Sequence, residues 1–362
     1  MAHRIFNFNA GPSTLPLDVL KIIQEELLDY RGTGMSVMEI SHRSPEFDEI
    51  NESAITLVRE LMGLDDKYHV MFCTGGASTQ FAMIPFNFAG NGQKGAYVDT
   101  GTWSTKAIKE ANIMGGAHLA GSSKDNEYRH IPKAADLDVP ANSPYLHITT
   151  NNTIKGTQWH YTPEYDGIPL IADMSSDILS HQLDYSKFAM VYAGTQKNLG
   201  PAGACLVVMH DDLLQKRKDG NPAMWDYRTY ATKKSLYNTP PSLTIYIVKL
   251  ILEWIKNQGG LAAVEKVNKA KYDKVYGMID QYPDFFKGTV QTDSRSWMNA
   301  TMRLPNEDLE KKLIADAKAA GFGGLKGHRS VGGIRISMYN AMTLEGVEKV
   351  LGFMDEFRKA NS

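Results

Sequence analysis

Short apolar runs recur through the first two thirds of this chain, separated by longer mixed segments. They occur at residues 69–73, 95–99, 145–150, 169–174, 188–194 and 204–209. The runs do not alternate cleanly between apolar and polar positions, which is typical of strands buried on both faces of a mostly parallel sheet. Because most are separated by enough residues for a crossover helix, the pattern predicts an α/β doubly wound domain.

Helical spacing of apolar residues flanks this region on both sides. Residues 16–30 and 45–61 each carry an apolar stripe. Ser44 precedes Pro45, and this pair is typical of a helix N-cap followed by a proline in the first turn. Beyond Pro240 the pattern is helical through residue 279, with Gly259-Gly260 expected to cap the first helix of this region.

The C-terminal segment predicts a smaller α+β unit. Its expected elements are strands at 299–304 and 334–338 and helices at 308–320 and 344–358. We therefore expect an N-terminal arm (1–15), a large domain (16–258) and a small domain with its linking helix (259–362).

Composition and charge narrow the functional classes. Apolar residues make up 43% of the chain, charged residues 22%, and the net charge is -2, as in ordinary soluble globular proteins. Mixed charges argue against nucleic-acid or anionic-membrane binding, so any anion site must be built from a few placed residues. No apolar stretch reaches the roughly 18 residues of a membrane span, and the N-terminus does not resemble a secretory signal.

The two cysteines, Cys73 and Cys205, lie inside apolar runs. They give neither a disulfide framework nor a metal-binding spacing. We expect a cytoplasmic protein with no metal site.

A glycine-rich segment follows the first predicted strand. It reads TGGAST at 74–79 and opens an expected helix. Ligands of open α/β sheets gather at the carboxyl ends of the strands, and free backbone N–H groups at a helix start bind phosphate. Ala77 and Ser78 would then lie at a phosphate, although an ordinary capped turn fits the same residues equally well.

An aspartate and a lysine lie at the ends of two other predicted strands. Asp173 ends the run at 169–173, and Lys197 closely follows the run at 188–194. A buried charge needs a partner, and each residue alone is more often structural. Together with the phosphate cradle they favour pyridoxal 5′-phosphate: the lysine bonds the aldehyde, and the aspartate keeps the pyridine nitrogen protonated.

Trp103 and Thr153 also follow predicted strands. The indole could cover the pyridine face and the threonine could donate to the ring hydroxyl. A partly buried core tryptophan and a loop threonine are the alternatives.

Two basic pairs, His42-Arg43 and His328-Arg329, stand out, with Arg335 near the second. The arginine fork matches carboxylate and phosphate, and histidine adds a donor. Solvated surface arginines would explain one such pair, but two suggest a substrate with at least two anionic groups.

Four ordered segments resemble one known family. They are FNFNAGPSTLP (6–16), GMSVMEISHRSPEF (34–47), AGTQKNLGPAG (193–203) and KGHRSVGGIRISMYNAM (326–342). They resemble the phosphoserine aminotransferases, which are fold type I pyridoxal-phosphate enzymes among the class V aminotransferases, and the match covers nearly the whole chain. This resemblance implies a large domain with a mostly parallel seven-stranded sheet and a smaller α+β C-terminal domain.

The resemblance also implies an activity. The enzymes transfer the amino group of L-glutamate to 3-phosphohydroxypyruvate, giving O-phospho-L-serine and 2-oxoglutarate in L-serine biosynthesis. A further role in pyridoxine biosynthesis stays open. The expected assembly is a homodimer with shared active sites.

Residue by residue, the resemblance implies the following roles. Lys197 bonds the cofactor, Asp173 pairs with its ring nitrogen, Trp103 stacks on the ring, and Thr153 contacts its hydroxyl. The cofactor phosphate is bound by Ala77, Ser78 and Gln196, with Asn238 and Thr239 of the other subunit. Arg335 holds the substrate α-carboxylate, and His42, Arg43, His328 and Arg329 hold the distal anionic group. Ala77-Ser78 stand where another branch of the family has Gly-Arg, so the substrate phosphate depends on the two His-Arg pairs.

Two alternatives remain at this point. One is another fold type I enzyme, either a desulfurase or an aminotransferase for a different anionic keto acid. A desulfurase needs a cysteine in a mobile loop, whereas both cysteines here lie in predicted strands. The other is a non-catalytic protein that binds a phosphate or a nucleotide on an α/β scaffold.

Overall fold

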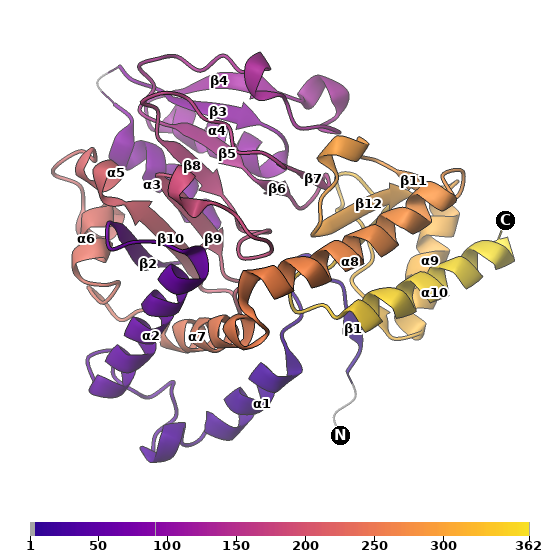
Figure 1. The fold of residues 1–362 in the computed structure, drawn as a ribbon, viewed down its shortest axis with the longest axis horizontal. Coiled ribbons are helices and arrows are strands. Elements are labelled where there is room, and N and C mark those ends of the chain that lie inside the picture. Colours follow the sequence, from indigo (N-terminus) through magenta and orange to yellow (C-terminus); the bar gives the residue numbers. More distant parts are fainter. Residues whose placement is uncertain (1–3, 91, 362) are drawn as a thin grey trace.

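The structure, a computed structural model, describes residues 4–90 and 92–361. The outer ends of the predicted arm and small domain, residues 1–3 and 362, lie outside this range. Figure 1 shows a large α/β part built on one sheet and a smaller part formed by the end of the chain, with the long helix α8 (Gly260–Gln281) running between them.

The central sheet has seven strands in the order β2-β10-β9-β8-β5-β3-β4. Only β10 runs antiparallel to its neighbours; the other pairs are parallel. The predicted fold class is therefore confirmed. The strands are β2 (Tyr68–Thr74), β3 (Gly95–Asp99), β4 (Ala117–Ser122), β5 (Leu146–Thr149), β8 (Leu170–Asp173), β9 (Met190–Gly194) and β10 (Ala204–His210).

Both faces of this sheet are buried, as the runs without alternation predict. Alternate residues of β10 separate into two cores: Leu206 and Val208 pack with α2 and α7, and Cys205 and Val207 with α3 and α4. The helices of this part are α1 (Leu17–Glu26), α2 (Pro45–Met62), α3 (Ala77–Phe88), α4 (Thr102–Ile113), α5 (Asp211–Gln215), α6 (Tyr227–Thr232) and α7 (Ser242–Asn257).

The C-terminal part has its own core around an antiparallel sheet of order β11-β12-β14. Phe8 from the N-terminal arm is fully buried in that core. The domain boundaries at residues 15 and 258 stay a prediction. The elements are β1 (Phe6–Asn7), which pairs with β13 (Phe322–Gly323), then β11 (Lys287–Gly288), β12 (Asn299–Arg303), β14 (Ile334–Ser337), α9 (Glu307–Ala319) and α10 (Leu344–Asn361). The short hairpin β6 (Asn151–Asn152) and β7 (Thr157–Gln158) belongs to neither main sheet.

Several local predictions are confirmed and others are corrected. Ser44 caps α2 by accepting a hydrogen bond from the backbone N–H of Phe47. The predicted helix at 16–30 ends at Glu26, and a 3-10 turn covers Tyr30–Gly32. Gly259, at φ 101°, directly follows Gln258, the C-cap of α7, and its N–H donates to Lys256 O at 3.0 Å, so it ends α7 as predicted. Gly260 is the first residue of α8.

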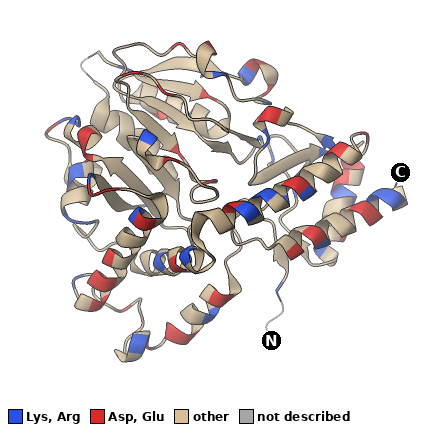
Figure 2. Ribbon diagram, viewed as in Figure 1, with Lys and Arg blue, Asp and Glu red and all other residues tan. Residues whose placement is uncertain are grey.

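The outer surface carries both charges side by side. Figure 2 shows Lys/Arg and Asp/Glu alternating along α8 and α10. These helices therefore present no face of a single sign. In the described part of the chain, no helix is both long and apolar enough to cross a bilayer.

Candidate active site

The carboxyl ends of the parallel strands meet at one edge of the sheet, and the candidate site is built there. After β2 the chain turns through Gly75, at φ 103°, and enters α3. No side chain caps this helix at Gly76. The first N–H groups of α3, those of Ala77 and Ser78, therefore lack intrahelical partners. They form the positive end of the helix dipole, which suits a bound anion.

A single cavity brings together six predicted residues: Ala77, Ser78, Trp103, Asp173, Gln196 and Lys197. Its remaining lining comes from residues that sequence reasoning missed: Gly76, Phe81, Thr149, Asn151, Ser175 and Ser176. Four of these six lie at or just after the ends of β5 and β8: Thr149, Asn151, Ser175 and Ser176. Their position after buried apolar runs is the sequence feature that could have identified them.

Lys197 is buried, with a residual exposure of 9%. Its amine donates a hydrogen bond to Thr153 Oγ1 at 2.7 Å and lies 5.8 Å from the centre of the Trp103 ring. Burial lowers the pKa of Lys197 to about 8, and the nearby charge of Arg335 also lowers it, against Asp173 and Asp177, which raise it. The amine is thus available in its neutral, nucleophilic form close to neutral pH.

The N-terminal arm packs against the loop that carries this lysine. The Ser13 backbone N–H donates to Gln196 O at 3.0 Å, and the Ser13 hydroxyl donates to Lys197 O at 2.5 Å. A side chain at Gly11 would start 3.5 Å from Lys197 Cγ. The GPS segment at 11–13 therefore fixes the backbone of the lysine loop.

Asp173 ends β8 and is buried. Its Oδ1 accepts hydrogen bonds from the Ser175 N–H at 2.9 Å and the Ser175 hydroxyl at 2.6 Å. Burial raises the pKa of Asp173, while Ser175, Lys197 and Tyr192 lower it. A cation held against this carboxylate would offset its cost of burial.

The donor set fits pyridoxal phosphate. Among the described residues, Trp103 Nε1 and Thr149 Oγ1 are buried without a hydrogen-bond partner. An uncapped helix start for a phosphate, a buried carboxylate for a ring nitrogen and a buried amine for an aldehyde converge on one cavity.

Comparison with known proteins gives the family. The family model for class-V aminotransferases matches residues 5–350. The chain belongs to this family. Its relatives include the phosphoserine aminotransferases of Desulfosudis oleivorans, 52% identical over 100% of both chains, and Geobacillus kaustophilus, 51% identical over 98% of this chain and 99% of the relative.

Solved structures agree. The phosphoserine aminotransferase of Bacillus circulans subsp. alkalophilus is 47% identical, with a TM-score of 0.98 over 100% of both chains. A phosphoserine aminotransferase of Trichomonas vaginalis solved with bound pyridoxal phosphate is 35% identical, with a TM-score of 0.92 over 97% of this chain and 100% of that one. The present chain is thus a pyridoxal-phosphate-dependent aminotransferase, and the predicted cofactor is confirmed.

Cationic groups lie beside the cofactor cavity of this aminotransferase. Arg335, on β14, donates from Nη1 to Thr153 O at 3.3 Å, and its buried Nε has no partner among the described residues. Burial lowers the pKa of His328, and the positive charges of Arg335, Arg329 and Lys106 lower it further. The aminotransferase therefore holds a local excess of positive charge suited to an anionic substrate.

The single chain does not bring every predicted residue to the cavity. His42 and Arg43 lie just before α2, and Asn238 and Thr239 lie between α6 and α7. None of these four lines the cofactor cavity. Their predicted roles require a second chain.

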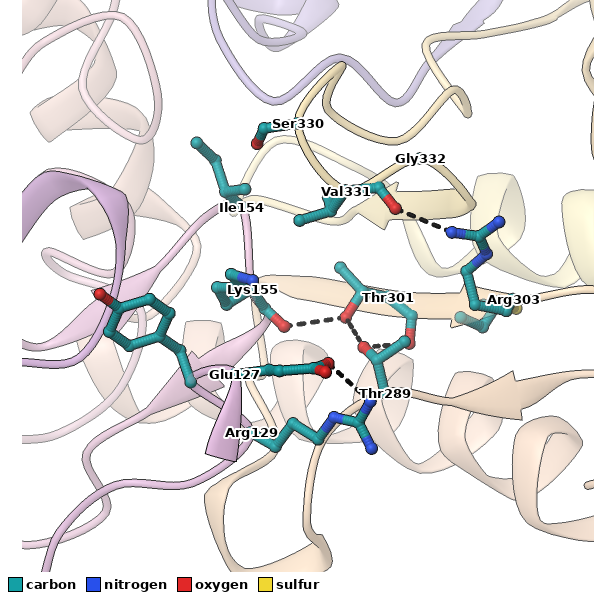
Figure 3. A pocket seen from close by; sticks show the side chains of 12 residues that line it. Glu127, Arg129, Ile154, Lys155, Thr289, Thr301, Arg303, Ser330, Val331 and Gly332 are labelled. Atoms are coloured by element: carbon teal, nitrogen blue, oxygen red, sulfur yellow. Dashed lines mark hydrogen bonds and ion pairs between the residues drawn. The ribbon is translucent and has the colours of Figure 1, made fainter. Parts of the chain in front are cut away.

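A second cavity, of about 320 Å³, lies where the two parts of the aminotransferase meet (Figure 3). Its rim carries Arg129, paired with Glu127, as well as Lys155 and Arg303. It contains none of the predicted site residues. It adjoins the loop that follows His328 and Arg329, because Ser330 to Gly332 form part of its wall.

Proposed function

We propose that this aminotransferase is a phosphoserine aminotransferase, which moves the amino group of L-glutamate to 3-phosphohydroxypyruvate and releases O-phospho-L-serine and 2-oxoglutarate. The observation that carries the proposal is the positive charge beside the buried Lys197. Arg335 lies close enough to Lys197 for their charges to interact, and Arg335 and Arg329 both act on His328. Two guanidinium groups and an imidazole donor suit a substrate with two anionic ends. The names of relatives about half identical to this chain support it. This activity would serve L-serine biosynthesis, which we expect to take place in the cytoplasm.

Lys197 and Asp173 have separate roles in the reaction. When bound, pyridoxal phosphate withdraws electrons from the bonds at the substrate α-carbon. Lys197 removes the proton from the α-carbon of the amino donor as a general base, and it protonates the α-carbon of the new amino acid in the second half-reaction. Asp173 supplies the negative charge that keeps the ring nitrogen cationic.

Other residues bind and orient. Trp103 covers the ring, Thr153 contacts its hydroxyl, and Arg335 holds the α-carboxylate. The cofactor phosphate is held by Ala77, Ser78 and Gln196, with Asn238 and Thr239 from a second chain. The distal phosphate or γ-carboxylate is held by His328 and Arg329, with His42 and Arg43 from the second chain. The active unit is therefore a homodimer.

The test is a substrate comparison. Purified protein with glutamate is assayed on 3-phosphohydroxypyruvate and on hydroxypyruvate. Because a site built for a polar group leaves its own charges unpaired when that group is missing, we expect kcat/KM to differ by at least ~100-fold. Equal values would overturn the substrate assignment, and Arg329→Ala should reduce the preference.

A further inference from the structure

A buried chain of two polar side chains, Tyr192 and His147, lies next to Asp173 and outside the lining of the cofactor cavity. Tyr192, on β9, is the register partner of Asp173 on β8. On the next strand, β5, His147 Nε2 lies 2.9 Å from the Tyr192 hydroxyl oxygen. Exposed fractions are 0% for Tyr192, 1% for His147 and 4% for Asp173, so solvent does not supply any of these hydrogen bonds.

The number of protons on these side chains decides which group donates and which accepts. Tyr192 lies beside Asp173 in the register of β8 and β9, and its side chain is among the groups that lower the pKa of Asp173. A carboxylate only accepts, so the single Tyr192 proton points toward Asp173. The hydroxyl oxygen must then accept from His147, which requires the proton on Nε2.

The unpaired nitrogen of His147 agrees with this direction. Burial lowers the pKa of His147 to about 3, so the ring is neutral and carries one N–H. Nδ1 has no hydrogen-bond partner among the described residues. With the opposite direction, the only acceptor for Nδ1–H would be the backbone of His147 itself, in a geometry too poor to form a full hydrogen bond. Tyr192 would also turn a lone pair toward the carboxylate, which is repulsive.

We propose that His147 and Tyr192 are positioning residues that donate in series toward Asp173, hold it ionised, and thereby set how tightly the aminotransferase binds pyridoxal phosphate and keeps its ring nitrogen protonated. The inference rests on the proposed role of Asp173. Around this chain, Ser175 and Lys197 also face Asp173, Asp177 lies close enough to Asp173 for their charges to interact, and the Tyr97 ring lies 5.0 Å from the His147 ring.

The same core supplies a matched control. Tyr145 shares a hydrogen bond of 2.7 Å with Tyr97 and is equally buried, but it has no recorded contact with Tyr192 or Asp173. Tyr145→Phe therefore removes one buried hydroxyl without touching the chain. Tyr192→Phe removes one buried hydroxyl from its centre.

Cofactor affinity is the first readout, measured by titrating apoprotein with pyridoxal phosphate. Because a hydrogen bond to a charged group is lost, we expect Tyr192→Phe to raise the Kd about 10-fold, and Tyr145→Phe to change it less than about 2-fold. The pH at which the visible band of the bound cofactor changes should move in Tyr192→Phe only. Equal effects of the two variants would overturn the proposal.

Variants at His147 test the direction. Gln can place an N–H donor near the position of Nε2, whereas Leu cannot. We expect His147→Gln to keep an affinity near that of the unmodified protein, and His147→Leu to lose about 3- to 10-fold. Nitrogen-15 NMR of the unmodified apoprotein, which needs no variant to fold, should show His147 protonated at Nε2 across pH 6 to 9, and an Nδ1–H form would refute the proposal.

Asp173→Asn distinguishes a failure of the role proposed for Asp173 from a failure of the role proposed for Tyr192 and His147. If this variant binds the cofactor normally, the role of Asp173 fails and the inference fails with it. If Asp173→Asn weakens binding and Tyr192→Phe does not, only the inference fails.

Discussion

At the scale of single residues, Lys197 and Lys271 show how surroundings decide what a buried amine does. Within residues 4–90 and 92–361, the Lys197 amine donates one hydrogen bond, to Thr153 Oγ1, and it faces a cavity. Lys271, on α8, donates to three backbone carbonyls, Met338 O and Tyr339 O at 2.9 Å and Met342 O at 3.0 Å. Three acceptors match the three N–H groups of an ammonium, so Lys271 is a structural cation although burial lowers its pKa to about 7.

The rate at which apoprotein captures pyridoxal phosphate should report the pKa of Lys197. Only the neutral amine attacks the aldehyde, so the rate should rise with pH and level off above an inflection near 8, not near the ordinary value of 10.5. Stopped-flow absorbance measures this. Because Asp177 raises the pKa of Lys197, Asp177→Asn should move the inflection to lower pH, and a profile still rising at pH 10 would contradict the expectation.

Replacing Lys271 should unfold the protein more readily without any direct effect on the cavity. Lys271→Met leaves three buried carbonyls unpaired, so we expect the free energy of unfolding to fall by about 3 kcal/mol or more. Lys269, on the same helix, forms an exposed pair with Asp273, and Lys269→Met should cost less than about 1 kcal/mol. Denaturant titration of both variants measures this difference. A similar loss of unfolding free energy in the two variants would disprove the structural role of Lys271.

Sequence reasoning reached some site residues and missed others for a physical reason. Asp173 and Lys197 could be predicted because a charged residue at the end of an apolar run needs an explanation. His147 and Tyr192 lie inside β5 and β9, where a histidine or tyrosine is indistinguishable from ordinary core. Their partners become visible only when strand order places β5, β8 and β9 side by side.

At the scale of elements, one ion pair holds the loop that carries His328 and Arg329. Glu310, on α9, accepts from Arg303 Nε at 2.6 Å and from the Gly333 N–H at 3.2 Å. Arg303, on β12, donates in turn to Val331 O at 2.9 Å (Figure 3). The loop bends through Gly332 and Gly333 at φ 69° and 72°, a conformation that other residues rarely adopt.

Loosening this loop should weaken substrate binding selectively. Glu310→Gln removes the negative charge and replaces one acceptor oxygen with an N–H donor, so one hydrogen bond to the loop is lost. We therefore expect KM for the phosphorylated keto acid to rise about 10-fold. The kcat and the cofactor affinity should be nearly unchanged. Glu307 lies 3.9 Å from Arg303 and is exposed. Steady-state kinetics on Glu307→Gln should show almost no change, and an equal rise in both variants would exclude the role given to Glu310.

Element prediction succeeded where burial is strong and failed where it is weak. The six predicted runs of the central sheet are all strands. The edge strand β4 was missed because its sequence, AHLAGS, is small and half exposed, so it carries no apolar run. The reversed direction of β10 leaves no trace in the residues of the strand itself, which are buried on both faces in either direction. The available signal was the short connection: residues 195–203 are too few for a crossover helix between β9 and β10.

At the scale of the whole molecule, exposed apolar side chains concentrate in one stretch of the chain. Leu17, Ile22, Leu27, Leu28, Met35 and Met38 are all at least 36% exposed, and Leu28 reaches 84%. Figure 1 shows α1 projecting from the lower edge of the molecule. An apolar surface of this kind is typical of protein interfaces. It lies in the same segment as His42 and Arg43, which the proposed function assigns to a neighbouring active site.

Introducing charge into this surface should therefore separate the chains and weaken the cofactor site together. In Leu28→Glu/Met38→Glu two carboxylates would be buried at the interface, so we expect a shift from dimer to monomer in sedimentation velocity at micromolar concentration. Because Asn238 and Thr239 would no longer reach the neighbouring cofactor phosphate, the Kd for pyridoxal phosphate should rise in parallel. Leu119→Glu is the control: this side chain is 53% exposed on β4, far along the sheet from α1 (Figure 1), and it should stay dimeric. A monomeric double variant with full cofactor affinity and activity would show that each chain builds its own site alone, and the four residues given to the second chain would need other roles.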